Sequence, residues 1–145
     1  MEQAGGSTHG SETDRLALAG ASGVVGRCRD FVHASLAARG WLDDPDEERR
    51  AVVEDVMLMT SELVTNACLH AGGPREVSVR DAGRSRLRVE VVDASPQRPT
   101  LRTLEAPAHP GGHGLRVVDR LASRWGSEPR PEGKAVWFEI ERPTV

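Results

Sequence analysis

Two polar side chains, Glu62 and Asn66, stand four residues apart within an apolar stretch of the chain. Residues with this spacing lie one above the other on the same face of a helix. A carboxylate there can orient a hydroxyl group and accept its proton. An amide oxygen is a hard ligand that suits Mg²⁺ beside a phosphate. The pair would therefore suit phosphate chemistry, although most such pairs on helices are simply solvated.

The element that must position this pair is a long helix, predicted from about Glu47 to His70. Apolar residues recur along it at helical spacing: Val52, Val56, Met59, Leu63 and Ala67. The loop before it offers capping chemistry, and Gly72-Gly73-Pro74 breaks the chain after it. Glu62 and Asn66 then border the apolar stripe, where a half-buried site can form.

The remaining elements indicate an α+β fold, a mostly antiparallel sheet with helices on one face. The first is an edge strand expected over Arg15–Ala21, followed by a helix that is capped by Ser22, runs to Arg39 and ends at Gly40. After the long helix we expect a hairpin of two strands, Glu76–Arg80 and Leu87–Val92, with its turn at Arg84-Ser85. A helix from Gly114, a strand near Trp125 and a final strand over Ala135–Glu141 complete the chain. Residues 1–14 are expected to be a disordered tail and residues 15–145 one domain.

Composition narrows the class of protein. The net charge of −3 gives no electrostatic case for direct nucleic-acid binding. No apolar run is long enough to span a membrane, and the polar N-terminus lacks the core of a signal peptide, so a cytoplasmic setting is expected. Cys28 and Cys68 lie in apolar helical patterns and are predicted to be buried free thiols.

Two further places could bind a nucleotide. Asp93 ends an apolar strand and precedes Ser95, so its carboxylate either accepts a hydrogen bond from an exocyclic amine such as that of adenine or forms an ordinary turn. A proline-rich segment over Ala94–Gly112 has the length of a lid, and the glycines at its end precede a helix. Such a helix start can bind phosphate, or it can be a plain linker.

A competing interpretation rests on Gly20, Gly23 and Gly26, which resemble a dinucleotide-binding fingerprint. Strands and helices do not continue to alternate after it, however, which argues against an NAD(P)-binding sheet.

The order and spacing of four motifs resemble the boxes of the GHKL ATPase superfamily over about Arg15 to Arg142. The motifs are Glu62-x-x-x-Asn66, Asp93-x-Ser95-Pro96, Gly112-His113-Gly114-Leu115 and Gly133-Lys134. The chain is most similar to the small anti-sigma-factor serine/threonine kinases and related actinobacterial regulatory ATP-binding proteins. The resemblance implies a Bergerat fold, which is a two-layer α/β sandwich.

The resemblance also implies roles for single residues. Glu62 matches the general base, Asn66 the Mg²⁺ ligand and Asp93 the carboxylate that recognises adenine. The glycines at the lid end match phosphate contacts, and Gly133-Lys134 opens the box near the base pocket.

Four positions depart from the family pattern. Ser95 and Gln97 stand where glycines are usual, His113 where close relatives often carry arginine, and Ala135 where many carry a threonine that helps to hold adenine. An alanine there would lose a hydrogen bond worth about 0.5–1.5 kcal/mol.

The function implied is that of an anti-sigma factor that binds ATP and Mg²⁺ and phosphorylates a serine or threonine of an antagonist protein. Its partners would be a sigma factor and that antagonist, with no membrane or nucleic acid involved, and a homodimer is a further expectation. The alternative is a non-catalytic module of the same fold, in which ATP only sets the affinity for a partner.

Overall fold

The computed structural model describes residues 12–18, 22–43, 46–96 and 114–142. Its elements are, in chain order, β1 Thr13–Ala17, α1 Val24–Ala38, α2 Glu47–His70, β2 Pro74–Gly83, β3 Arg86–Asp93, α3 Gly114–Leu121, β4 Arg124–Arg130 and β5 Gly133–Glu141. Thr13 and Asp14, predicted to belong to the tail, are part of β1.

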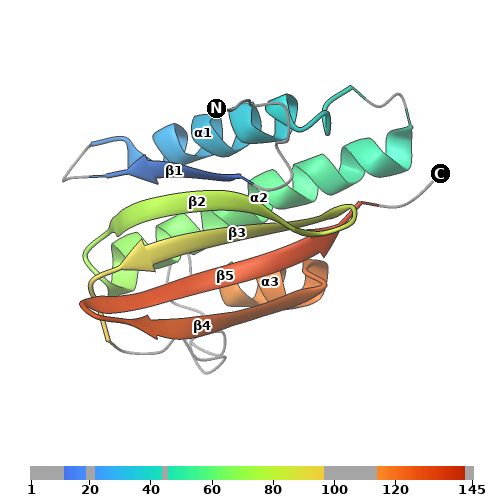
Figure 1. Ribbon diagram of the computed structural model, residues 1–145. Helices are drawn as coiled ribbons and strands as arrows, with labels where there is room; N and C mark the ends of the chain where they lie inside the picture. The colour runs from blue at the N-terminus through green and yellow to red at the C-terminus, as the bar shows by residue number, and fades with distance from the viewer. Residues whose placement is uncertain (1–11, 19–21, 44–45, 97–113, 143–145) are drawn as a thin grey trace.

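The strands form one sheet in the order β1-β2-β3-β5-β4, and each neighbouring pair is antiparallel. The three described helices lie together on one face of this sheet (Figure 1). The predicted α+β, two-layer plan is therefore confirmed. A dinucleotide-binding fold requires parallel strands joined by helices. The described strands contain no parallel pair, so that interpretation was wrong.

The start of α1 differs from its prediction. Gly23 is the N-cap residue, with a left-handed φ of 65°, and no side chain caps the helix there. Ser22 is therefore not the cap. Glycine adopts this backbone conformation without the steric cost that other residues incur. The helix therefore begins at a backbone turn of Gly23 and not at a side-chain cap. The helix ends as predicted, just before Gly40, whose φ is 78°.

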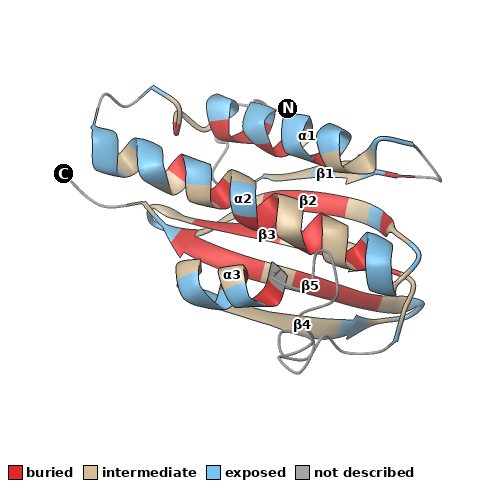
Figure 2. Ribbon diagram, turned by 180° about the vertical axis from the view of Figure 1, so that it is seen from behind, coloured by how far each residue is buried: buried red, intermediate tan, exposed pale blue. Residues whose placement is uncertain are grey.

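The core lies between the helices and the inner face of the sheet (Figure 2). Alternate residues of the three central strands point into it and are buried: Val77, Val79, Leu87, Val89, Val91, Val136, Phe138 and Ile140. The helices contribute a matching buried set: Val32, Leu36, Val56, Met59, Leu63, Val64 and Ala67. The long α2 crosses the middle of the sheet, and its apolar stripe fixes which of its faces is turned outward.

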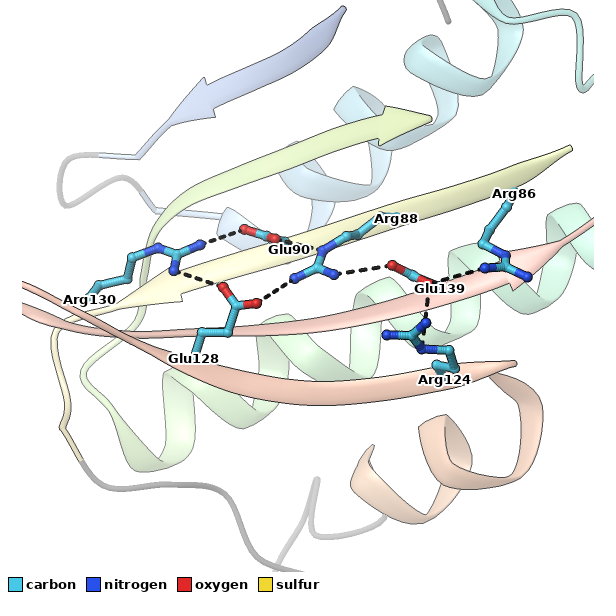
Figure 3. A network of polar contacts seen from close by, with 7 residues as sticks. All are labelled: Arg86, Arg88, Glu90, Arg124, Glu128, Arg130 and Glu139. Atoms are coloured by element: carbon cyan, nitrogen blue, oxygen red, sulfur yellow. Dashed lines mark hydrogen bonds and ion pairs between the residues drawn. The ribbon is translucent and has the colours of Figure 1, made fainter. Parts of the chain in front are cut away.

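The opposite face of the sheet carries a network of charged side chains in place of helices (Figure 3). Its centre is Arg88, which is only 7% exposed. The guanidinium bonds Glu90 at 2.7 Å, Glu128 at 3.0 Å and Glu139 at 3.1 Å. It also stacks on the Trp137 ring, 3.9 Å from the centroid. These side chains shield one another from water and so cover the middle of a face that no described helix covers.

A second buried arginine ties the edge strand to the rest of the domain. The side chain of Arg39, at the end of α1, is 2% exposed and pairs with Asp14 of β1 at 2.6 Å and with Asp81 of β2 at 3.2 Å. It also donates to the Ser35 hydroxyl at 2.7 Å. One guanidinium therefore joins β1, α1 and β2.

The two cysteines differ in exposure. Cys28 is fully buried in α1, and desolvation, with a smaller effect from Cys68, raises the pKa of its thiol to about 11. Cys68 is exposed near the end of α2, so the prediction of a buried thiol was wrong there. Helical spacing alone does not show which positions at the margin of an apolar stripe face water.

Candidate functional site

The long helix α2 carries Glu62 and Asn66 as predicted. The helix is capped by Asp46, whose carboxylate accepts a hydrogen bond from the Glu48 N–H at 2.9 Å. Glu62 and Asn66 are both half-buried, and each precedes a buried residue of the apolar stripe. No described residue hydrogen-bonds either side chain, so both retain their capacity to bind a ligand.

Ser61, directly before Glu62, links α2 to α1. Its hydroxyl donates to the Met57 carbonyl oxygen at 3.0 Å and accepts from the Arg29 guanidinium at 2.7 Å. This bond joins α1 to α2 at the position directly before Glu62. Sequence reasoning missed this role, because nothing in the spacing of Arg29 and Ser61 indicates that the two helices meet there.

Asp93 lies at the end of β3 and is 3% exposed. It faces the helix side of the sheet, because side chains alternate along a strand and Val89 and Val91 lie in the core. Its Oδ1 atom accepts from the Ser95 N–H at 2.9 Å and from Lys134 Nζ at 3.0 Å. The local turn contact is therefore present, and the contact of Asp93 with a base stays a prediction. For that contact, Oδ2 has no donor among the described residues.

Gly133 explains why the last strand can begin beside Asp93. A Cβ atom at Gly133 would overlap the Asp93 carbonyl oxygen and lie 2.8 Å from Ala94 backbone atoms. Only glycine permits this close approach of two backbones. The next residue, Lys134, then pairs in register with Asp93 across the two strands.

The register also shows on which face of the sheet Ala135 lies. Ala135 pairs with Val92, and both residues point to the face opposite that of Asp93 and Lys134. A hydroxyl at position 135 would therefore not lie beside the Asp93 carboxylate. The residue that occupies that place is Lys134, and its pairing with Asp93 was not foreseen.

These groups converge at one edge of the domain. The C-terminal end of α2, the end of β3 and the start of β5 lie together at this edge (Figure 1). Helix α3 packs beside α2 on the same face of the sheet, begins at Gly114 and buries Leu115. The other lid residues singled out, Gly112 and His113, lie outside the described residues.

A hollow of about 700 Å³ borders this edge between the loop after α2 and β1. It reaches the site only at Ala94 and is lined by none of Glu62, Asn66 and Lys134. Its size is within the range of ligand pockets, but the side chains that could select a nucleotide lie beside the hollow and do not line it.

A model of the histidine kinase-like ATPase domain family matches residues 23–140, which is most of the chain. The chain therefore belongs to this family and is an ATP-binding domain of the GHKL superfamily. No curated protein matches it significantly. None of the described helices is long and apolar enough to cross a membrane.

The residues present fit a nucleotide with its metal ion. Within the described ranges, no three His, Cys, Asp or Glu side chains come together as a metal cage. Mg²⁺ commonly needs no such cage, because phosphate oxygens and water supply most of its ligands. The Asn66 amide oxygen can add one protein ligand, and Asp93 Oδ2 can accept from a base.

Proposed function

We propose that this domain is a regulatory serine/threonine kinase of the anti-sigma-factor type. One observation carries the proposal: α2 carries Glu62 and Asn66 one turn apart near its C-terminal end. That end of α2 lies at the same edge of the sheet as the end of β3 and the start of β5, where Asp93 and Lys134 pair (Figure 1). The proposal assigns a proton acceptor, a metal ligand and a base-binding acid to this edge.

Each residue has a distinct task in the proposed transfer. Asp93 accepts a hydrogen bond from the base, and Asn66 holds the Mg²⁺ that the nucleotide phosphates bring with them. Glu62 orients the hydroxyl group of the protein substrate and accepts its proton as the hydroxyl oxygen bonds to the γ-phosphorus. The bond from that phosphorus to the bridging oxygen breaks, and ADP leaves. The negative charge on the transferring phosphoryl group is stabilised mainly by polar groups that are already held in position.

The substrate and partners follow from the sequence resemblance. The substrate would be a serine or threonine of an antagonist protein, and the partners would be that antagonist, a sigma factor or both. The domain would act on these proteins in the cytoplasm, and a homodimer remains part of the proposal.

The test is transfer of labelled phosphate from ATP to a candidate antagonist. Wild-type protein should label the antagonist, and Glu62→Gln should lower the rate at least about 100-fold while retaining ATP binding, because it removes the proton acceptor. Glu54→Gln, on an exposed position of the same helix, is the matched control. Equal rates for wild type and Glu62→Gln would refute the assigned role.

A second function is favoured by one observation. No described residue hydrogen-bonds Glu62, whereas catalytic bases are commonly oriented by a further group. In this alternative the domain binds ATP and a partner without transferring phosphate. It predicts unlabelled antagonist in the assay above, together with partner affinity that changes when ATP is added.

A further inference from the structure

The edge of the sheet that carries Asp93 also carries a residue type that occurs nowhere else in the chain. Lys134 is the only lysine among the 19 basic residues, and every other one is an arginine. It is also 6% exposed, whereas lysine is almost never fully buried unless it is paired. Its position therefore requires a reason specific to an ammonium group.

The geometry around Lys134 supplies that reason. Its Nζ lies 3.0 Å from Asp93 Oδ1 and 3.4 Å from the Ser95 carbonyl oxygen. The Ser95 N–H donates to the same Oδ1 at 2.9 Å. A carboxylate oxygen has two lone pairs, so Oδ1 is saturated by these two donors. The other oxygen, Oδ2, has no donor among the described residues and is left for a ligand.

An arginine would not replace the lysine here. A guanidinium is a planar fork that commonly engages both oxygens of a carboxylate, whereas an ammonium is a compact point charge that can bind one. The close approach at Gly133 and the strand register fix where the Lys134 stem begins. The ammonium therefore holds one oxygen of Asp93 and leaves the second oxygen without a donor among the described residues.

We propose that Lys134 is the positioning residue for base recognition. By binding Oδ1 of Asp93 it turns Oδ2 toward the exocyclic amine of the bound purine, and so it sets the preference of the site for a 6-aminopurine. This inference rests on the proposed nucleotide binding at Asp93. It goes beyond it by assigning the selectivity to a residue other than the acid itself.

The first test compares two nucleotides on purified full-length protein. ATP carries the 6-amino group, and purine riboside 5′-triphosphate carries hydrogen in its place. Calorimetry with Mg²⁺ gives the ratio of their dissociation constants for wild type, for Lys134→Met and for the control Arg15→Met, which removes an exposed positive charge on β1. A general loss of stability would weaken both ligands alike, whereas loss of positioning changes the ratio.

Wild type and Arg15→Met should prefer ATP to the same degree. In Lys134→Met the preference should fall about tenfold, equivalent to about 1.4 kcal/mol, because the carboxylate is then no longer held by the ammonium and can turn away from the base. An unchanged ratio in Lys134→Met would overturn the role of Lys134. Absence of ATP binding by wild type would instead overturn the proposed function.

A second measurement needs no variant and so does not depend on its folding. Protein labelled with ¹³C at lysine Cε gives one side-chain signal, because the chain contains one lysine. The signal should move when ATP binds and move differently when purine riboside 5′-triphosphate binds. Identical spectra for the two complexes would contradict contact between the lysine, Asp93 and the base.

Discussion

At the scale of single residues, the side chains best able to bind a ligand are those whose hydrogen-bonding atoms have no partner among the described residues. Glu62 and Asn66 are half-buried and accept no hydrogen bond from any described residue. Asp93 is buried but keeps one oxygen without a donor among the described residues. A polar group held in place without a partner incurs a desolvation cost that a ligand can relieve.

The role of Asn66 predicts a metal-specific defect. Asn66→Ala should weaken ATP binding about 10- to 100-fold when Mg²⁺ is present, the loss expected for a contact with a charged group. Binding measured in excess chelator should change little, because the amide then has no ion to hold. Calorimetric titrations under the two conditions give both values. An equal loss in both would mean that Asn66 supports the helix rather than the metal.

Much of the candidate site could be predicted from residue types and their spacing. The pair on α2 follows from helical periodicity, and Asp93 follows from its place at the end of an apolar strand. The contact of Lys134 with Asp93 could not be read in this way, because it depends on the register of two strands that are distant in sequence. The same register places Ala135 on the face opposite that of Asp93, which the sequence alone did not indicate.

At the scale of elements, the end of a helix could be predicted from the sequence where a particular residue type marks it. The bounds of α2 follow from the Asp46 cap and from the glycines after His70. The start of α1 was predicted from Ser22 but depends on the backbone of Gly23. Contacts between elements, such as those of Arg39, have no counterpart in any local pattern.

The Arg39 contacts predict that this side chain adds to the backbone pairing that holds β1 on β2. Arg39→Met should destabilise the domain by about 1–3 kcal/mol, because it leaves Asp14 and Asp81 without their shared cation. Hydrogen exchange should accelerate in β1 far more than in β5, which lies inside the sheet. Uniform acceleration across both strands would show that Arg39 supports the whole core instead.

At the scale of the whole molecule, the two faces of the sheet are covered by different means. Helices bury one face with apolar side chains, and the Arg88 network covers the other with paired charges (Figure 3). Hydrogen bonds from Arg130 and Arg88 also hold the pKa of Glu128 below its usual value, although desolvation opposes this effect. The bonds of Glu128 therefore stabilise the fold most above the usual pKa of glutamate, and this contribution is lost as the pH falls through the lowered pKa of Glu128.

The network predicts unequal costs for two arginine substitutions on the same face. Arg88→Met should lower the free energy of unfolding by about 3 kcal/mol at neutral pH, because it leaves buried carboxylates uncompensated. Arg124→Met removes a side chain that is 62% exposed and should cost no more than about 0.5 kcal/mol. Urea unfolding of both variants measures the difference. Similar values for the two would show that the buried network adds no more than a surface charge.

The central claim, that this domain binds ATP through an acid at the end of β3, is tested most directly by titrating ATP·Mg²⁺ into wild type and Asp93→Asn. The substitution keeps the shape of the side chain and removes the charged acceptor. We predict saturable binding of one ATP by wild type and an affinity at least about tenfold lower in Asp93→Asn, with folding of both checked by circular dichroism. Equal affinities of the two proteins for ATP would contradict the assignment of the base site to Asp93.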